Sequence, residues 1–290
     1  MRIQPSRKKR QRRQNRARLF GTERSRSARR LICETLESRQ LLAGGFGTEP
    51  IYDVNVTSDI VYRDDAEVGY GTPEGVTTID LELDIYEPSG PGLPNELPAV
   101  LLIHGGGFTG GSKGQQNFVD LANDFASRGY VAASINYRLD GDNVPPAPAN
   151  PPYSDLDPRY DAIVAAVEDT YHAIEWFKDS ASTLGIDAER IVLGGHSAGG
   201  FLSTIAGMLD TPDVPPFGLD IDITDLDVAA VLDGAGGTGG LAGSIIDSAD
   251  PPTFILHSSD DATVLYSEAV AIADALTAAN VPFEFPVITD

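Results

Sequence analysis

The sequence contains a single cysteine, Cys33, among its 290 residues. One cysteine cannot form an intrachain disulfide, and it rules out a metal site built from several cysteines. The sequence also lacks any run of 18 apolar residues, which excludes a membrane-spanning helix. Apolar residues make up 41% and charged residues 22% of the chain, a composition typical of globular proteins. The length allows one large domain or two small ones.

Basic residues are scarce outside the N-terminal part of the chain. Fourteen of the 21 lysines and arginines lie in residues 1–40, together with three acidic residues, whereas residues 41–290 hold seven basic and 40 acidic residues. Such an acidic body repels the phosphates of DNA and RNA and the anionic surface of a membrane. We therefore expect no nucleic-acid partner for the folded part of the chain.

Residues 1–45 form a basic segment that holds too few apolar side chains to build a core, so we expect it to be disordered. Its charge leaves open a solvated tail, a tether to an anionic surface or a targeting segment. The apolar residues 31–33 are too few for an ordinary secretory signal. Residues 36–43 (Leu-Glu-Ser-Arg-Gln-Leu-Leu-Ala) resemble the LEPR-XLL segment of certain bacterial exported and cell-surface proteins, with Ser38 in place of proline. The resemblance implies an exported or cell-surface protein.

Residues 50–290 alternate short apolar runs with amphipathic stretches. The alternation in residues 79–85 predicts an edge or early antiparallel strand with one solvated face, and the continuous apolar run 100–103 suits a parallel strand buried on both faces. Strands that alternate with helices predict a mostly parallel, doubly wound α/β sheet with helices on both faces. The predicted strands lie at residues 79–85, 100–103, 131–135, 190–193, 228–232, 253–256 and 283–288, and the predicted helices at residues 118–125, from 163 to about 178, from 198 and at 269–276.

Two stretches interrupt this alternation. Residues 141–158 contain six prolines and predict an irregular loop. Residues 212–227 combine prolines with aspartates, but an EF-hand calcium loop needs glycine at its sixth position, where this run has Asp225, and glutamate at its twelfth, which this run lacks. A solvated acidic loop is therefore favoured there, and we expect no metal site.

Residues 195–199 (Gly-His-Ser-Ala-Gly) fit the pattern G-x-S-x-G between a predicted strand and a predicted helix. A serine on such a tight turn is a candidate nucleophile, here Ser197. The backbone N–H of Ala198 opens the helix and faces the negative charge that develops when the serine attacks a carbonyl.

A glycine-rich segment, residues 104–108 (His-Gly-Gly-Gly-Phe), directly follows the strand 100–103. Its glycines allow backbone N–H groups to face an oxyanion. A phosphate-binding loop requires G-x-x-x-x-G-K-[ST] or G-x-G-x-x-G, and neither is present. An aspartate pair, Asp260 and Asp261, follows the strand 253–256, where a carboxylate can orient an imidazole as a catalytic triad needs. Two ordinary turn aspartates are the simpler interpretation of that pair alone.

Together these motifs resemble the α/β-hydrolase superfamily, and within it the HGGG-type esterase/lipase branch of hormone-sensitive-lipase-like carboxylesterases. The resemblance runs over residues 81–290 and includes residues 135–139 and 186–191. It implies an α/β-hydrolase fold and selects Asp261 over Asp260 through the family's H-G-x-x-D-x-x-V segment, in which Ser258 replaces the usual glycine. The site residues that it implies are the nucleophile Ser197, the acid Asp261 and an oxyanion hole made by Gly105, Gly106 and Ala198.

The general base of a triad is the missing element. The four histidines occupy the oxyanion loop, a helix, the variable position of the elbow and a strand end, and none fits; they are His104, His172, His196 and His257. In the family the catalytic histidine follows the last strand, which here is residues 283–288. We therefore expect a hydrolase domain, residues 50–290, that is incomplete at its C-terminus.

The sequence thus predicts a serine-type carboxylic-ester hydrolase that acts through an acyl-enzyme on short acyl esters, without a metal or organic cofactor. Small-molecule esters and acetyl or feruloyl groups on polysaccharides are the expected substrates. The loops 141–158 and 210–227 are expected to border the substrate pockets. A non-catalytic pseudo-hydrolase or truncated fragment and a serine peptidase of the same fold remain alternatives, and the oligomeric state is open.

Overall fold

The structure is a computed structural model that describes residues 49–147, 159–210, 217, 219 and 221–288. The chain divides into two units, Met1–Leu42 and Ala43–Asp290, and every described residue belongs to the second. The predicted targeting segment, residues 1–45, lies outside the described residues, as do residues 148–158 of the proline-rich loop. No helix in the described ranges combines the length and the apolar character needed to cross a membrane.

The core of this second unit is one nine-stranded sheet with the strand order β1-β2-β4-β3-β5-β6-β7-β8, while β9 pairs with β7 beyond that path. β2 pairs antiparallel with β1 and with β4, and every pairing from β4 to β9 is parallel. The predicted mostly parallel, doubly wound sheet is therefore confirmed. The strands are β1 (Asp53–Val68), β2 (Thr77–Ser89), β3 (Leu97–Ile103), β4 (Val131–Ile135), β5 (Ile186–His196), β6 (Ala230–Gly234), β7 (Thr253–Ser258), β8 (Phe283–Glu284) and β9 (Val287–Ile288).

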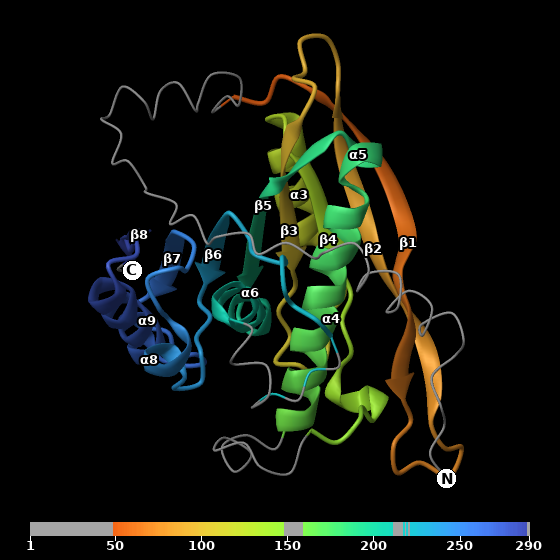
Figure 1. The fold of residues 1–290 in the computed structure, drawn as a ribbon, viewed down its shortest axis with the longest axis vertical. Coiled ribbons are helices and arrows are strands. Elements are labelled where there is room, and N and C mark those ends of the chain that lie inside the picture. The colour runs from red at the N-terminus through yellow and green to blue at the C-terminus, as the bar shows by residue number, and fades with distance from the viewer. Residues whose placement is uncertain (1–48, 148–158, 211–216, 218, 220, 289–290) are drawn as a thin grey trace, which may run out of the picture. The chain divides into compact units, whose positions relative to one another are not determined.

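Helices cover both faces of the sheet, as Figure 1 shows for α4 along one face and α3 on the other. Alternate residues of the fully buried β3 explain this arrangement, because Val100 and Leu102 pack with α3 whereas Leu101 and Ile103 belong to the larger core with α4 and α6. The helical elements are α3 (Gln116–Ser127), the 3₁₀ turn η1 (Asp140–Asp142), α4 (Tyr160–Asp179), α5 (Ala181–Leu184), α6 (Ala198–Met208), α8 (Ala242–Ile245) and α9 (Tyr266–Ala279).

The structure decides one local alternative and corrects one local prediction. Residues 79–85 belong to an early antiparallel strand, β2, and not to an edge strand, because the unpredicted strand β1 pairs along its outer side. The last strand is split into β8 and β9, and Pro286 between them has no N–H to donate to the ladder. The helix predicted at residues 118–125 is α3, and its buried face carries Phe118, Ala122 and Ala126, whereas Leu121 is 40% exposed.

Candidate active site

Ser197 stands at the sharp turn between β5 and α6. Its backbone has φ 56° and ψ −120°, a left-handed conformation that costs free energy for any residue with a side chain. The turn is held by its surroundings, because the Ser197 N–H donates to the carbonyl oxygen of Gly234 at 2.8 Å. Behind it, a Cβ atom on Gly199 would lie 1.9 Å from the carbonyl oxygen of Ile103, so only glycine lets α6 approach the end of β3 this closely.

The glycine-rich loop after β3 lies directly against this turn. A Cβ atom on Gly105 would lie 2.8 Å from the carbonyl oxygen of His196 and 3.3 Å from Cβ of Ser197. The structure therefore brings Gly105, one of the predicted oxyanion-hole residues, against the serine, and Ala198 adjoins the serine as the first residue of α6. Gly106 follows in the same loop and packs against Gly110. Backbone N–H groups at a helix N-terminus favour negative charge nearby.

The predicted acid, Asp261, lies in the loop after β7. Its Oδ1 accepts hydrogen bonds from the N–H groups of Thr263 at 2.7 Å and Val264 at 3.0 Å. The hydrogen bond from Thr263 lowers the pKa of Asp261, and the nearby imidazoles of His257 and His196 act in the same direction. The carboxylate is therefore ionised at neutral pH, as a group that supports an imidazolium must be.

The four histidines make their contacts away from the Ser197 hydroxyl. His257 is buried, and its Nε2 donates to the Val264 carbonyl at 2.8 Å, so this ring fixes the same loop from within. His172 lies between Glu168 and Glu175 on α4, and His196 is exposed. In the described part of the chain, no hydrogen bond joins Ser197 to any of the four histidines.

A cavity of about 490 Å³ opens at Ser197. Its charged lining groups are Arg159, which donates to the Gly107 carbonyl at 2.8 Å, and Glu268, whose Oε2 accepts from the N–H groups of Thr238 and Gly239, each at 3.1 Å. Of the two loops expected to border the substrate, the described part contributes Phe217 alone. The apolar lining comes from Phe108, Tyr160, Ile163, Ala198, Phe201, Ile205, Phe217, Leu241, Val264 and Leu265.

Sequence reasoning missed most of this lining. Its members come from the start of α4, the first turns of α6, the loop before α8 and the start of α9, and no sequence motif joins them. The cavity lies at the edge of the parallel sheet where β3, β5 and β7 all end. Across the described residues, no group of three or more histidine, cysteine, aspartate or glutamate side chains could hold a metal ion.

A serine on a strand-to-helix turn, a glycine loop against it and an acid after a later parallel strand define an α/β-hydrolase. The BD-FAE family model matches residues 83–151 and 159–239, just over half of the chain, and the chain belongs to that family. A second family model, described as Planctomycete extracellular, matches residues 28–46.

The curated relatives that the chain resembles include carboxylic-ester hydrolases. The chain is 31% identical over 142 residues to the carboxylesterase NlhH of Mycobacterium tuberculosis, and the aligned region covers 49% of the chain and 36% of that protein. It is 30% identical over 175 residues to the probable carboxylic ester hydrolase LipM of the same organism, covering 59% and 35%. The chain thus spans about a third of the length of the curated relatives it matches. These matches confirm the predicted resemblance to the esterase/lipase branch.

Solved structures share the fold. Esterase 2 of the planctomycete Thermogutta terrifontis superimposes with a TM-score of 0.60 at 24% identity, covering 83% of this chain and 82% of that one. The same esterase phosphorylated by paraoxon gives a TM-score of 0.61 at 25% identity, covering 81% and 82%.

Proposed function

We propose that the chain is a serine-type carboxylic-ester hydrolase. The observation that carries this proposal is the left-handed turn that presents Ser197 to an apolar cavity, with the glycine-rich loop against it. The family membership and the carboxylesterase relatives support the same reaction class.

In the proposed reaction, Oγ of Ser197 attacks the ester carbonyl while an imidazole base takes its proton, and the N–H groups of Gly105, Gly106 and Ala198 stabilise the tetrahedral oxyanion. The base passes that proton to the departing alcohol, and it then takes a proton from the water that cleaves the acyl-enzyme and releases the acid. In this proposal Asp261 orients the imidazole base. Nε2 of His257 lies 3.8 Å from Oδ2 of Asp261 but donates to the Val264 carbonyl, and among the described residues no histidine is hydrogen-bonded to Ser197.

The substrates that this site suits best are esters with short acyl groups, as free small molecules or as acyl substituents of a polysaccharide. The cavity supports this assignment, because its wall is mostly aliphatic and aromatic and its volume of about 490 Å³ lies in the lower half of the usual range for ligand pockets. No resident metal or organic cofactor takes part in the proposed reaction.

We further propose that the protein is exported, with residues 1–45 as a targeting segment ahead of a hydrolase domain at residues 50–290. The match of residues 28–46 to the Planctomycete extracellular model supports this proposal. So does the resemblance of residues 36–43 to the LEPR-XLL segment.

The test of the reaction is Ser197→Ala in the full-length protein, assayed with p-nitrophenyl acetate and with a peptide p-nitroanilide. Where an imidazole base serves Ser197, we expect ester hydrolysis to fall by at least about a thousandfold in Ser197→Ala, because the nucleophile is lost and the triad acts as a unit. Ser203→Ala is the matched control, since Ser203 is buried in the same helix and its Oγ bonds the Gly200 carbonyl. Unchanged ester hydrolysis in Ser197→Ala, or faster cleavage of the anilide than of the ester by the wild type, contradicts the proposal.

A further inference from the structure

The carbonyl groups of the glycine-rich loop are all held by side chains. Each carbonyl oxygen of residues 104–107 accepts a side-chain hydrogen bond, so none of the four peptide groups is free to rotate. The bonds are Tyr137 Oη to His104 O at 3.0 Å, His104 Nδ1 to Gly105 O at 2.8 Å, Thr109 Oγ1 to Gly106 O at 3.2 Å and Arg159 Nη1 to Gly107 O at 2.8 Å.

Holding a carbonyl also sets the direction of an N–H group. In a planar trans peptide, the carbonyl of one residue and the N–H of the next point in opposite directions. Tyr137, by fixing the His104 carbonyl, therefore directs the Gly105 N–H, and the His104 imidazole directs the Gly106 N–H in the same way. These are the two loop donors of the proposed oxyanion hole.

Tyr137 and His104 form a buried aromatic pair. Their rings stack with centroids 4.3 Å apart and an angle of 18° between planes. Burial raises the pKa of the Tyr137 phenol and lowers the pKa of the His104 imidazole. Both side chains are therefore neutral near pH 7, and each keeps the proton that it donates to the loop.

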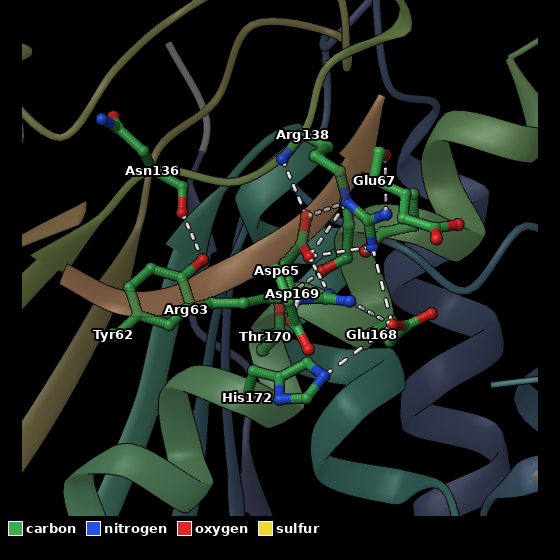
Figure 2. Close-up of polar contacts among 12 residues, drawn as sticks. Tyr62, Arg63, Asp65, Glu67, Asn136, Arg138, Glu168, Asp169, Thr170 and His172 are labelled. Carbon is green, nitrogen blue, oxygen red and sulfur yellow. Dashed lines mark hydrogen bonds and ion pairs between the residues drawn. The ribbon is translucent and has the colours of Figure 1, made fainter. Parts of the chain in front are cut away.

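The position of Tyr137 is fixed by its neighbours rather than by its own hydroxyl group. Arg138 is buried, and Asp169 of α4 accepts hydrogen bonds from both its backbone N–H and its guanidinium group, as Figure 2 shows. On the other side, Asn136 accepts from the Lys113 N–H at 2.8 Å through Oδ1 and from the Tyr62 hydroxyl at 2.6 Å through its carbonyl. Removing the Tyr137 hydroxyl therefore frees the loop carbonyl without displacing the ring.

We propose that Tyr137 is a positioning residue that aims the Gly105 N–H into the oxyanion hole. The inference rests on the proposed ester hydrolase function. Phenylalanine at this position retains the ring and its stacking on His104, so Tyr137→Phe removes only the hydrogen bond to the His104 carbonyl.

The test is Tyr137→Phe in the full-length protein, measured by kcat and KM for p-nitrophenyl acetate and by Kd for phenylboronic acid, which forms a tetrahedral adduct on a reactive serine. Tyr171→Phe is the matched control, because Tyr171 is also buried and donates to a backbone carbonyl, that of Ala206 at 2.9 Å. We expect Tyr137→Phe to lower kcat by about tenfold or more with KM within about twofold, and to raise the boronate Kd by a similar factor, because a donor loses its alignment. The control should keep all three values.

The outcomes separate the two proposals. If the wild type is active and Tyr137→Phe keeps its kcat and boronate affinity, the positioning role is wrong and the proposed function stands. An equal loss in Tyr171→Phe also overturns the role, because the effect would then follow from losing any buried tyrosine hydroxyl. A wild type that neither hydrolyses the ester nor binds the boronate overturns the proposed function, and the positioning role with it.

Discussion

Gly105→Ala tests the contact between the glycine-rich loop and the turn at Ser197. The new Cβ atom would lie 2.8 Å from the His196 carbonyl oxygen, whereas ordinary contacts begin near 3.4 Å, so the loop or the turn must move by about 0.6 Å. The backbone of Gly105 lies outside the left-handed region, so alanine adds no conformational strain of its own. The whole effect is therefore steric.

The expected result is a loss of catalytic rate with little loss of stability. A misplacement of 1 Å costs about a hundredfold in rate, so a shift of about 0.6 Å should lower kcat by about 10- to 100-fold, or about 1.4 to 2.7 kcal/mol of transition-state stabilisation. The assay is steady-state hydrolysis of p-nitrophenyl acetate, accompanied by urea denaturation.

Gly110→Ala is the matched control for this prediction. It adds the same methyl group to the same loop, where nothing lies within 4 Å of the new Cβ and the backbone is outside the left-handed region. We expect its kcat to equal that of the wild type within about twofold. If Gly105→Ala retains wild-type kcat, the loop does not supply the oxyanion donors in the arrangement described here.

Two further predictions concern buried carboxylates. Asp169→Asn should cost about 3–5 kcal/mol in the free energy of unfolding measured in urea, because the buried guanidinium groups of Arg63 and Arg138 lose one of the two carboxylates that they share, which leaves Glu168 as the only shared one. Asp124→Asn removes an exposed ion pair with Arg128 and should cost less than about 1 kcal/mol, so a cost below 1 kcal/mol for both variants would refute this prediction. Burial raises the pKa of Asp233 to about 7, so between about pH 4 and pH 7 the folded state keeps a proton that the unfolded chain releases, and the free energy of unfolding falls as pH rises. Asp233→Asn lacks this titration, so in urea denaturation its free energy of unfolding should rise relative to that of the wild type from pH 4 to pH 8. A difference that stays constant over this range would show that Asp233 is ionised throughout.

Sequence patterns predicted the elements whose structure depends on neighbouring residues. The small residues around Ser197 predicted the tight turn there, and a continuous apolar run predicted β3. β1 had no such signal, because its residues are mostly exposed and its structure depends on pairing with β2. The alternation in residues 79–85 put Asp84 on the solvated face, yet Asp84 is buried, because the ammonium group of Lys113 donates to its carboxylate at 2.7 Å and balances its charge. No local pattern shows this contact, since the two residues are 29 positions apart.

The residues of the candidate site also differ in how far the sequence predicts them. The glycine-rich loop, Ser197 and Asp261 could be predicted because each follows a strand that an apolar run in the sequence indicates. Arg159 and Glu268 could not, because they reach the cavity from the start of α4 and of α9, and a helix pattern does not show which helix ends meet. Tyr137 followed a predicted strand, but its role depends on a hydrogen bond to His104, which no local pattern reveals.

The pairing of β5 has a consequence for how the protein folds. Its two neighbours, β3 and β6, come from distant parts of the chain, and contacts of large sequence separation form slowly because the loop entropy must be overcome first. The strained backbone at Ser197 is supported from both sides, by Gly234 of β6 and by the end of β3 behind Gly199. The backbone of Ser197 therefore takes this conformation only when β3 and β6 have both paired with β5. If Ser197 is the nucleophile that we propose, a partly folded chain can have most of its helices and still be inactive, and ester hydrolysis reports that these three strands have assembled.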